Sequence, residues 1–343
     1  MGKQRIEYID AMRVFTMILV VFAHVCHFCF GDSRMGYNAI FILFRLPCFF
    51  MLSGWLFEPV SRNPFKTVAR HKPMVQLVPT FIFLLLLAPP PEFFHQLGAL
   101  KGGYWFTFVL FEFFILYMVI VRIGKHWTPI FAFAITIASF FYARYYDCLK
   151  SSSDGFQLLM IDFLGFLSVT TWRLFIFFYI GTWTRRHFDA FIRWTNKPVV
   201  ILLICAAFFL IASTSHKDNI WFEMFRYYIG GITGMVMIFT LFHLLYTSSI
   251  IHLPSSITHY PSTILKYVGT RTLDIYLLHY FFLPRFLMEY APQLQAYDSR
   301  LLEFVVIMAL SLIILAFCLI TSYVIRLSPF LGHYLFGVQR KSN

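Results

Sequence analysis

Charged residues are scarce in this sequence. Asp, Glu, Lys and Arg make up 13% of its 343 residues, and 59% of the residues are hydrophobic, whereas a soluble domain has about 25% charged residues. This balance excludes the soluble classes and predicts an integral membrane protein.

Several further features are missing. The apolar runs do not alternate with polar residues over about ten positions, which argues against the strands of a membrane barrel. The six cysteines lie mostly inside apolar runs and provide no disulfide framework. No small-residue cleavage site follows the first apolar run, which Asp10 and Arg13 interrupt, so we expect it to be a retained span. No repeat or soluble extension is visible, and residues 1–343 are expected to form one transmembrane domain.

Positive charge is the one kind of charge in excess, at a formal net +12. The basic residues lie in short clusters between apolar runs and form no continuous stripe, so we expect anionic membrane lipids as partners and no nucleic acid. With the N-terminus in the cytoplasm, 17 of the 28 Lys and Arg residues fall in inner segments, six in outer loops and the other five in or beside spans. Because positively charged loops stay inside, both termini are predicted to be cytoplasmic.

The apolar runs are long enough for helices that cross a bilayer. A hydrocarbon core of ~30 Å needs about 20 helical residues. We therefore predict an all-α bundle of ten spans, of which the third and seventh are the shortest. The predicted spans are 11–30, 37–57, 75–89, 104–121, 128–146, 156–182, 199–213, 221–246, 273–290 and 301–325.

The first span carries an unusual set of polar residues. An ionisable group at the bilayer centre costs at least ~2.5 kcal/mol, so each one is a candidate functional residue. Arg13 and His24 are eleven residues apart, which places them on one helix face about 16 Å apart along the axis, and Asp10 is one turn from Arg13 and can pair with it. The alternative is that Arg13 reaches the interface and His24 bonds a neighbouring helix.

A metal site in the same helix is not expected. The string from His24 to Cys29 contains two histidines and two cysteines, the ligand types that zinc prefers. On a helix, however, Cys26 and Cys29 are rotated well away from His24. One helix therefore cannot surround a tetrahedral ion with all four side chains.

Other spans also carry polar residues. In the second, Pro47 predicts a distorted helix that frees backbone carbonyls for Arg45, and Ser53 with Gly54 predicts a close approach of another helix. Tyr276 and His279 are one turn apart, and a packed core histidine is the alternative for His279. The further inward-facing candidates are Trp105, Glu112, Asp162, Arg173, Arg226, His243 and Asp274.

Four segments together resemble the membrane-bound acyltransferase-3 family. Residues 8–24 are similar to its opening helix, in which ten residues separate an arginine from a histidine, here Arg13 and His24. Residues 44–54 (FRLPCFFMLSG) resemble the corresponding segment of bacterial sugar O-acetylases of the fucose 4-O-acetylase type. Residues 104–111 (YWFTFVLF) and 269–279 (GTRTLDIYLLH) are similar to two later motifs in the same order. This sequence differs from the family pattern at Val14, where the family commonly has glycine, and at Arg45, where it frequently has histidine. The R-x-x-R pair that often precedes the proline of the third span is absent before Pro79.

The resemblance implies an O-acyltransferase in a bacterial inner membrane. The donor would be cytoplasmic acyl-CoA, used as a co-substrate with no permanently bound cofactor, and the acceptor a hydroxyl of a cell-surface glycan. Acetyl is the expected acyl group and succinyl the second candidate. His24, Arg13 and Asp10 are the predicted catalytic residues. The predicted binding residues are Arg45, Ser53, Arg70, Trp105, Glu112, Arg173, Tyr276 and His279.

Two other classes of membrane protein were considered as explanations for charged residues within the bilayer. A transporter or flippase for a glycan or small anion also lines its pathway with arginine and histidine. A purely structural membrane scaffold would have no use for Arg13, Arg45 and Arg173 in or near the bilayer. Without an inverted repeat in the sequence, the transporter stays the alternative to the enzyme.

Overall fold

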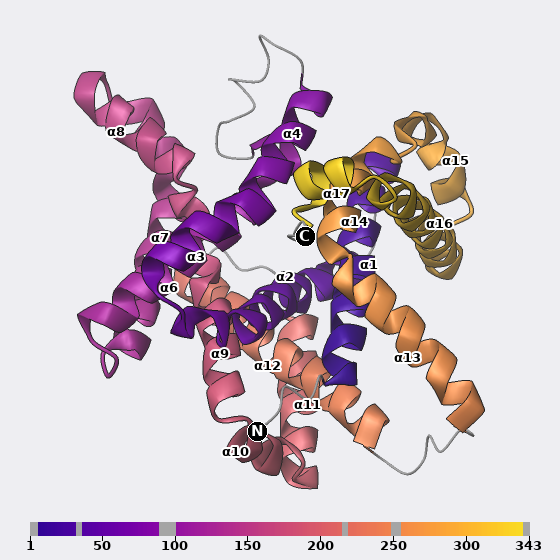
Figure 1. Ribbon diagram of the computed structural model, residues 1–343, viewed down its shortest axis with the longest axis horizontal. Coiled ribbons are helices and arrows are strands. Elements are labelled where there is room, and N and C mark those ends of the chain that lie inside the picture. Colours follow the sequence, from indigo (N-terminus) through magenta and orange to yellow (C-terminus); the bar gives the residue numbers. More distant parts are fainter. Residues whose placement is uncertain (1–5, 32–35, 89–100, 215–218, 248–254, 339–343) are drawn as a thin grey trace. The chain divides into compact units, whose positions relative to one another are not determined.

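The computed structural model describes residues 6–31, 36–88, 101–214, 219–247 and 255–338 (Figure 1). The elements in these ranges are helices, and no strand occurs among them, as predicted. The chain divides into two compact units. Unit 1 comprises Met1–Phe49 and Asp189–Ile325, and unit 2 comprises Phe50–Phe188 and Arg326–Asn343.

Unit 1 is organised around α1 (Glu7–Phe30), which contacts α12, α13, α14 and the 3₁₀ turn Arg285–Tyr290. Its apolar side chains, such as Met12, Met17 and Phe22, have no exposed surface. The helix ends at Gly31, whose positive φ of 67° lets its N–H bond the carbonyl of Cys26, a common helix C-cap. The other helices with residues in unit 1 are α2 (Gly36–Phe57), α10 (Phe188–Thr195), α11 (Pro198–Ser213), α12 (Ile220–Thr247), α13 (Ser255–Thr270), α14 (Thr272–Leu278), α15 (Ala291–Ala296) and α16 (Arg300–Arg326).

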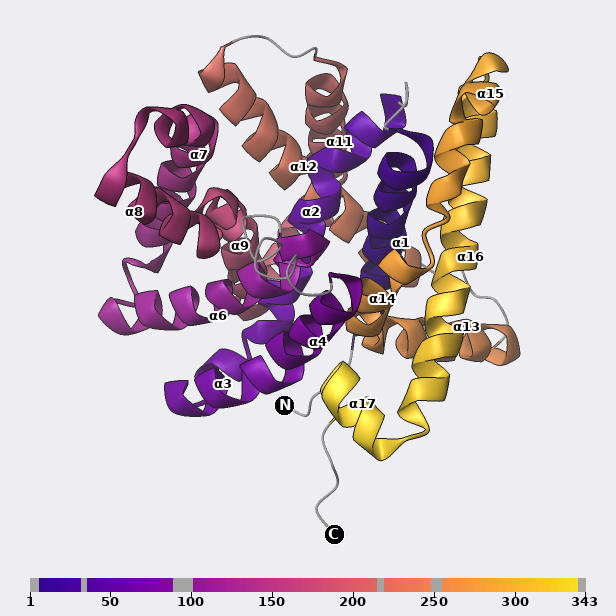
Figure 2. The ribbon, with the colours of Figure 1, turned by 90° about the horizontal axis from the view of Figure 1, so that it is seen from above.

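Unit 2 is held together by aromatic side chains. Phe113, Phe175 and Phe178 are fully buried, and Phe57 stacks on Phe114 with ring centroids 4.2 Å apart. α17 packs beside α4 (Figure 2). Besides the second half of α2, the unit contains the 3₁₀ turn Val60–Arg62, α3 (Phe65–Lys72), the π-turn Pro73–Leu77, α4 (Val78–Leu87), the 3₁₀ turn Lys101–Gly103, α6 (Trp105–Ile123), α7 (Thr128–Ser152), α8 (Gly155–Phe166), the 3₁₀ turn Val169–Leu174, α9 (Phe175–Arg186) and α17 (Pro329–Phe336).

Two glycines let α2 and α9 touch through their backbones. A Cβ atom on Gly54 would lie 2.0 Å from the carbonyl oxygen of Phe178, and one on Gly181 would lie 1.9 Å from that of Met51. Any larger residue at either position must push the helices apart. The predicted close approach at Ser53–Gly54 is therefore confirmed.

The described helices do not confirm the count of ten spans. Five described helices qualify as membrane spans, namely α1, the segment Ile40–Phe57 of α2, α6, α12 and α16, and seven qualify if two bent pairs each count as one. The predicted span 156–182 is one of these pairs, bent by 47°, and 199–213 belongs to the other, bent by 82°. The predicted span 273–290 is wrong as one continuous helix, because α14 ends at Leu278 and 3₁₀ turns follow.

Candidate functional site

An ion pair lies near the start of α1. The guanidinium of Arg13 is 3.5 Å from the carboxylate of Asp10, as the spacing predicted. The same guanidinium donates a hydrogen bond to the hydroxyl of Thr272, 3.0 Å away. Gly269 makes room for Asp10, because a Cβ there would lie 3.2 Å from the Cβ of Asp10. Arg13 thus joins α1 to the first residue of α14.

His24 lies farther along the same helix and has a defined tautomer. Its Nδ1 is 2.8 Å from the carbonyl oxygen of Val20. A carbonyl can only accept, so Nδ1 carries the proton and Nε2 has a free lone pair. That lone pair accepts a hydrogen bond from the hydroxyl of Tyr280, 2.9 Å away. In its neutral form the imidazole therefore presents a basic nitrogen toward the turn that follows α14.

His279 lies beside His24 with the same tautomer. The two ring centroids are 4.8 Å apart. The Nδ1 of His279 donates to the carbonyl oxygens of Tyr276, at 2.7 Å, and Ile275, at 3.2 Å. Its Nε2 is buried and accepts no hydrogen bond from the described residues. Two neutral imidazoles and one phenol thus form a cluster, which we call the histidine cluster (His24, His279 and Tyr280).

Arg45 provides positive charge in the same unit. It is buried, donates a hydrogen bond to the side-chain oxygen of Asn38 at 3.2 Å, and interacts electrostatically with His24. Arg13 sits about three helical turns from His24. Arg45 is therefore the better placed of the two arginines to act on charge that develops beside His24.

The other predicted binding residues lie in unit 2. Glu112 accepts a hydrogen bond from the indole N–H of Trp172 at 2.8 Å, which joins α6 to the turn that carries Arg173. Trp105 lies beside the ring of Phe50. Ser53 occupies the α2 surface near its crossing with α9, and Arg70 is exposed in the last turn of α3. The roles predicted for these residues stay predictions.

Three of the further candidates have structural partners. Asp162 is half-exposed and pairs with Lys150 at 2.7 Å, so its predicted inward orientation is wrong. Asp274 is buried and accepts a short hydrogen bond from Ser322. The imidazole of His243 is buried beside the amide of Asn196, at 3.3 Å. Across the described ranges, no three His, Cys, Asp or Glu side chains gather as metal ligands would.

Sequence reasoning missed Tyr280, Thr272 and Lys101. The ammonium of Lys101 is buried, donates to the carbonyl of Phe166 at 2.7 Å, and lies over the ring of Phe108. Burial lowers the pKa of Lys101 below the usual value for lysine, and the nearby carboxylate of Glu112 partly opposes this shift. For Tyr280, the available signal was its place next to His279.

Comparison with known proteins yields one match. A family model described as an acyltransferase domain matches residues 6–323, which include every residue of the histidine cluster and the Asp10–Arg13 pair. Neither the curated proteins nor the solved structures contain a significant match to the chain.

Proposed function

The chain belongs to the membrane-bound acyltransferase-3 family, and from this premise we propose that it transfers an acyl group from acyl-CoA to a hydroxyl of a glycan. The observation that carries the proposal is the orientation of His24, whose Nδ1 faces the carbonyl of Val20 and whose Nε2 faces the hydroxyl of Tyr280. Acyl transfer to an alcohol needs a base for the hydroxyl proton and positive charge for the oxyanion. His24 and Arg45, which both belong to unit 1, are the residues proposed for these two roles.

The transfer proceeds through base catalysis at His24. An acceptor hydroxyl takes the place of the Tyr280 hydroxyl at Nε2 and gives up its proton there, while its oxygen attacks the thioester carbonyl carbon. The negative charge that forms on the carbonyl oxygen is stabilised by Arg45. Collapse of the tetrahedral intermediate breaks the carbon–sulfur bond, and the imidazolium returns its proton to the departing thiolate of coenzyme A.

Asp10 and Arg13 act in this scheme as positioning residues. Arg13 holds Thr272 at the start of α14, and the same short helix leads directly into His279 and Tyr280. A shift of α14 along α1 would move the phenol and the second imidazole relative to His24. The ion pair with Asp10 fixes the guanidinium for this contact.

The positive charge of the loops indicates the side of the membrane on which the acyl donor binds. Coenzyme A carries phosphates, which arginine-rich segments attract, and these segments fall in the loops assigned to the cytoplasm. We therefore assign acyl-CoA to the cytoplasmic side and the glycan acceptor to the outer side of a bacterial inner membrane, with acetyl as the acyl group and succinyl as the second candidate. With donor and acceptor on opposite sides of the membrane, the enzyme that joins them has to span it.

The test is an acyl-transfer assay with purified protein. Labelled acetyl-CoA and, separately, succinyl-CoA are incubated with a panel of glycans, and label on the glycan is measured. We expect transfer by the wild type and a loss of at least ~100-fold in His24→Ala, since a positioned base contributes about 10²–10⁴-fold.

The matched control is His27→Ala. His27 is one turn from His24 on the same helix but is exposed, and its removal should leave the rate within about twofold. Undiminished transfer by His24→Ala would exclude the assigned base. Transport of a glycan without label transfer would instead favour the transporter.

A further inference from the structure

A second polar site lies within unit 2 and includes none of the residues assigned to acyl transfer above. It is a pocket of about 410 Å³ where the C-terminal ends of α2, α6 and α9 meet. We call it the basic pocket. Its charged lining residues are Glu58, Arg62, Arg122, Lys125 and Arg186, which leaves a net of three positive charges.

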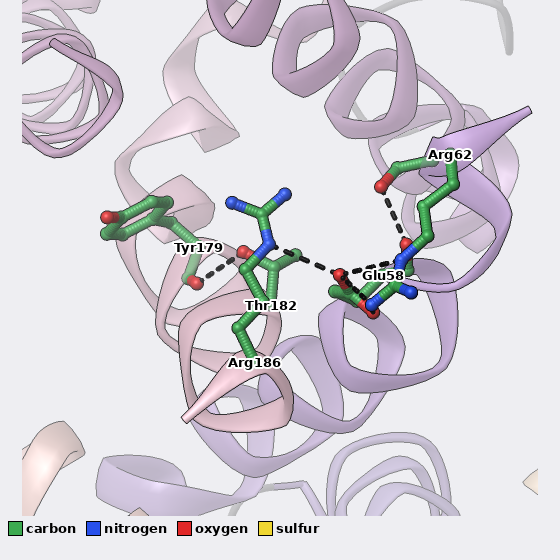
Figure 3. A network of polar contacts seen from close by, with 6 residues as sticks. Glu58, Arg62, Tyr179, Thr182 and Arg186 are labelled. Atoms are coloured by element: carbon green, nitrogen blue, oxygen red, sulfur yellow. Dashed lines mark hydrogen bonds and ion pairs between the residues drawn. The ribbon is translucent and has the colours of Figure 1, made fainter. Parts of the chain in front are cut away.

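One buried carboxylate organises the pocket (Figure 3). Arg62 donates to both oxygens of Glu58, with its Nη2 at 3.0 and 3.1 Å. Arg186 approaches the same carboxylate from α9, with its Nε 3.2 Å from Oε1. Glu58 is 2% exposed, whereas the side chain of Arg62 is 72% exposed. The carboxylate therefore holds two guanidinium groups side by side without neutralising the pocket.

A buried phenol also lines the pocket. Tyr117 is 1% exposed, and its hydroxyl lies near the hydroxyl of Thr182 and the guanidinium of Arg186. Thr182 donates to the carbonyl of Tyr179 at 2.7 Å, and Arg186 donates from its Nε to Glu58. The wall of the pocket beside Arg186 is therefore well packed.

Basic residues at helix C-termini also have a simpler use, since they balance the negative end of the helix dipole. That use explains Arg122 and Arg186 at the ends of α6 and α9. It does not explain a buried carboxylate that gathers two arginines. Neighbouring Arg185 is not among the lining residues of the pocket, and its guanidinium lies over the ring of Trp55, 4.8 Å from the centroid.

We propose that the basic pocket binds a phosphate ester. Arginine side chains match the geometry of phosphate oxygens, and the volume falls in the range of about 300–1,000 Å³ found for small-molecule sites. A single phosphate ion leaves most of that volume empty, so the ligand carries a diphosphate or an attached group that contacts Met118 and Val121. The two sources are the diphosphate of coenzyme A, an identification that rests on the proposed function, and the headgroup of an anionic lipid.

The experiment measures binding without acyl transfer. Full-length protein in nanodiscs of zwitterionic lipid is titrated with coenzyme A and with inorganic pyrophosphate by calorimetry. Arg186→Gln and Arg122→Gln should each weaken binding by about tenfold or more, because each removes a charge-assisted contact. Arg185→Gln is the matched control and should bind as the wild type does.

A second titration distinguishes coenzyme A from an anionic lipid headgroup as the ligand of the basic pocket. A short-chain anionic phospholipid is titrated into the same variants in zwitterionic nanodiscs. Binding of coenzyme A with the stated variant pattern supports the soluble source. Binding of the lipid alone, with the same pattern, assigns the pocket to a headgroup phosphate and removes coenzyme A. If Arg186→Gln and Arg122→Gln, folded by size-exclusion chromatography, bind every probe as Arg185→Gln does, the proposal is overturned.

Different experimental results would contradict the proposed function and the proposed phosphate-ester site. His24→Ala leaves the basic pocket intact and should bind coenzyme A with wild-type affinity while it transfers no acyl group. Phosphate-ester binding by a protein that shows no transfer to any glycan would contradict the proposed function and leave the basic pocket supported.

Discussion

The histidine cluster and the basic pocket place polar groups in opposite ways. In the histidine cluster, backbone carbonyls accept from the Nδ1 atoms of two imidazoles, so that in the neutral form the Nε2 lone pairs are presented. In the basic pocket, a carboxylate fixes two cations, and donor groups are presented. A neutral imidazole is suited to accept a proton, and a cluster of cations is suited to hold an anion.

The difference shows what each arginine contributes. Arg13 binds a neutral hydroxyl on another helix and an acid on its own, so its geometry matters more than its charge. Arg186 shares a carboxylate with Arg62 at an open pocket, so its charge matters for any ligand. Substitutions that keep charge and lose geometry should therefore affect the two sites differently.

The largest expected effect is on acyl transfer by variants of Arg13. Arg13→Ala should reduce the rate by at least ~100-fold, and Arg13→Lys should restore little, because lysine lacks the planar guanidinium that bonds Thr272. Thr272→Val should reduce the rate less. The combined Arg13→Ala, Thr272→Val variant should be no worse than Arg13→Ala alone, since coupled residues are not additive.

The measurement is the initial rate of label transfer at saturating donor, with protein amount checked by fluorescence-detected chromatography. Arg186→Lys provides the comparison, because it keeps the charge of the basic pocket and should retain most of its phosphate binding. An additive double variant would show that Arg13 does not act through Thr272.

The second-largest expected effect is a loss of stability of unit 2 when Gly181 is replaced. Gly181→Val places side-chain atoms against the backbone of Met51 and should destabilise the protein by about 1–3 kcal/mol or more. Gly165→Ala is the control, because its nearest neighbour is the end of the Tyr146 side chain, at 2.9 Å, which can move.

Thermal unfolding in detergent checks the stability difference. If the two units are stabilised separately, Gly181→Val should weaken phosphate binding more than it slows label transfer, with both measured well below the unfolding temperature. Equal unfolding temperatures for Gly181→Val and the wild type would contradict the close crossing of α2 and α9.

Helical periodicity accounts for the parts of the site that one helix determines. The common face of Arg13 and His24 and the pairing of Asp10 with Arg13 follow from spacing along α1, and the pair is present. The small surface at Gly54 likewise follows from residue size and is confirmed by its contact with Phe178. These features depend on neighbours one to three turns away.

The missed residues depend on distant parts of the chain. Tyr280 bonds His24 across 256 residues, and Arg186 bonds Glu58 across 128. Spacing within a helix indicates which face a side chain occupies, but not which helix covers it. The breaks in the predicted spans were missed for a related reason, since hydropathy alone cannot distinguish a continuous span from the turns that follow α14.

The smallest expected effect is a pH dependence that comes from Lys101. Burial lowers the pKa of this lysine below the value of about 10.4 in an unfolded chain. Between the lowered pKa and about pH 10.4 the unfolded chain binds more protons than the folded one, so stability rises with pH there, by at most ~1.4 kcal/mol per pH unit. Below that window the cost of burying the charge is fully present and does not vary with pH.

Lys101→Met should remove the part of the pH dependence of stability that comes from Lys101. The wild type and the variant are compared by their unfolding temperatures between pH 7 and 10.5. Some slope will persist, because burial also lowers the pKa of Lys72, whose ammonium lies 4.9 Å from the ring centroid of Phe114. Lys150→Met is the control, since Lys150 is paired with Asp162 at the surface and its pKa is raised instead. A slope in Lys101→Met equal to that of the wild type would mean that Lys101 is solvated, and the contact of its ammonium with Phe166 would then not persist in solution.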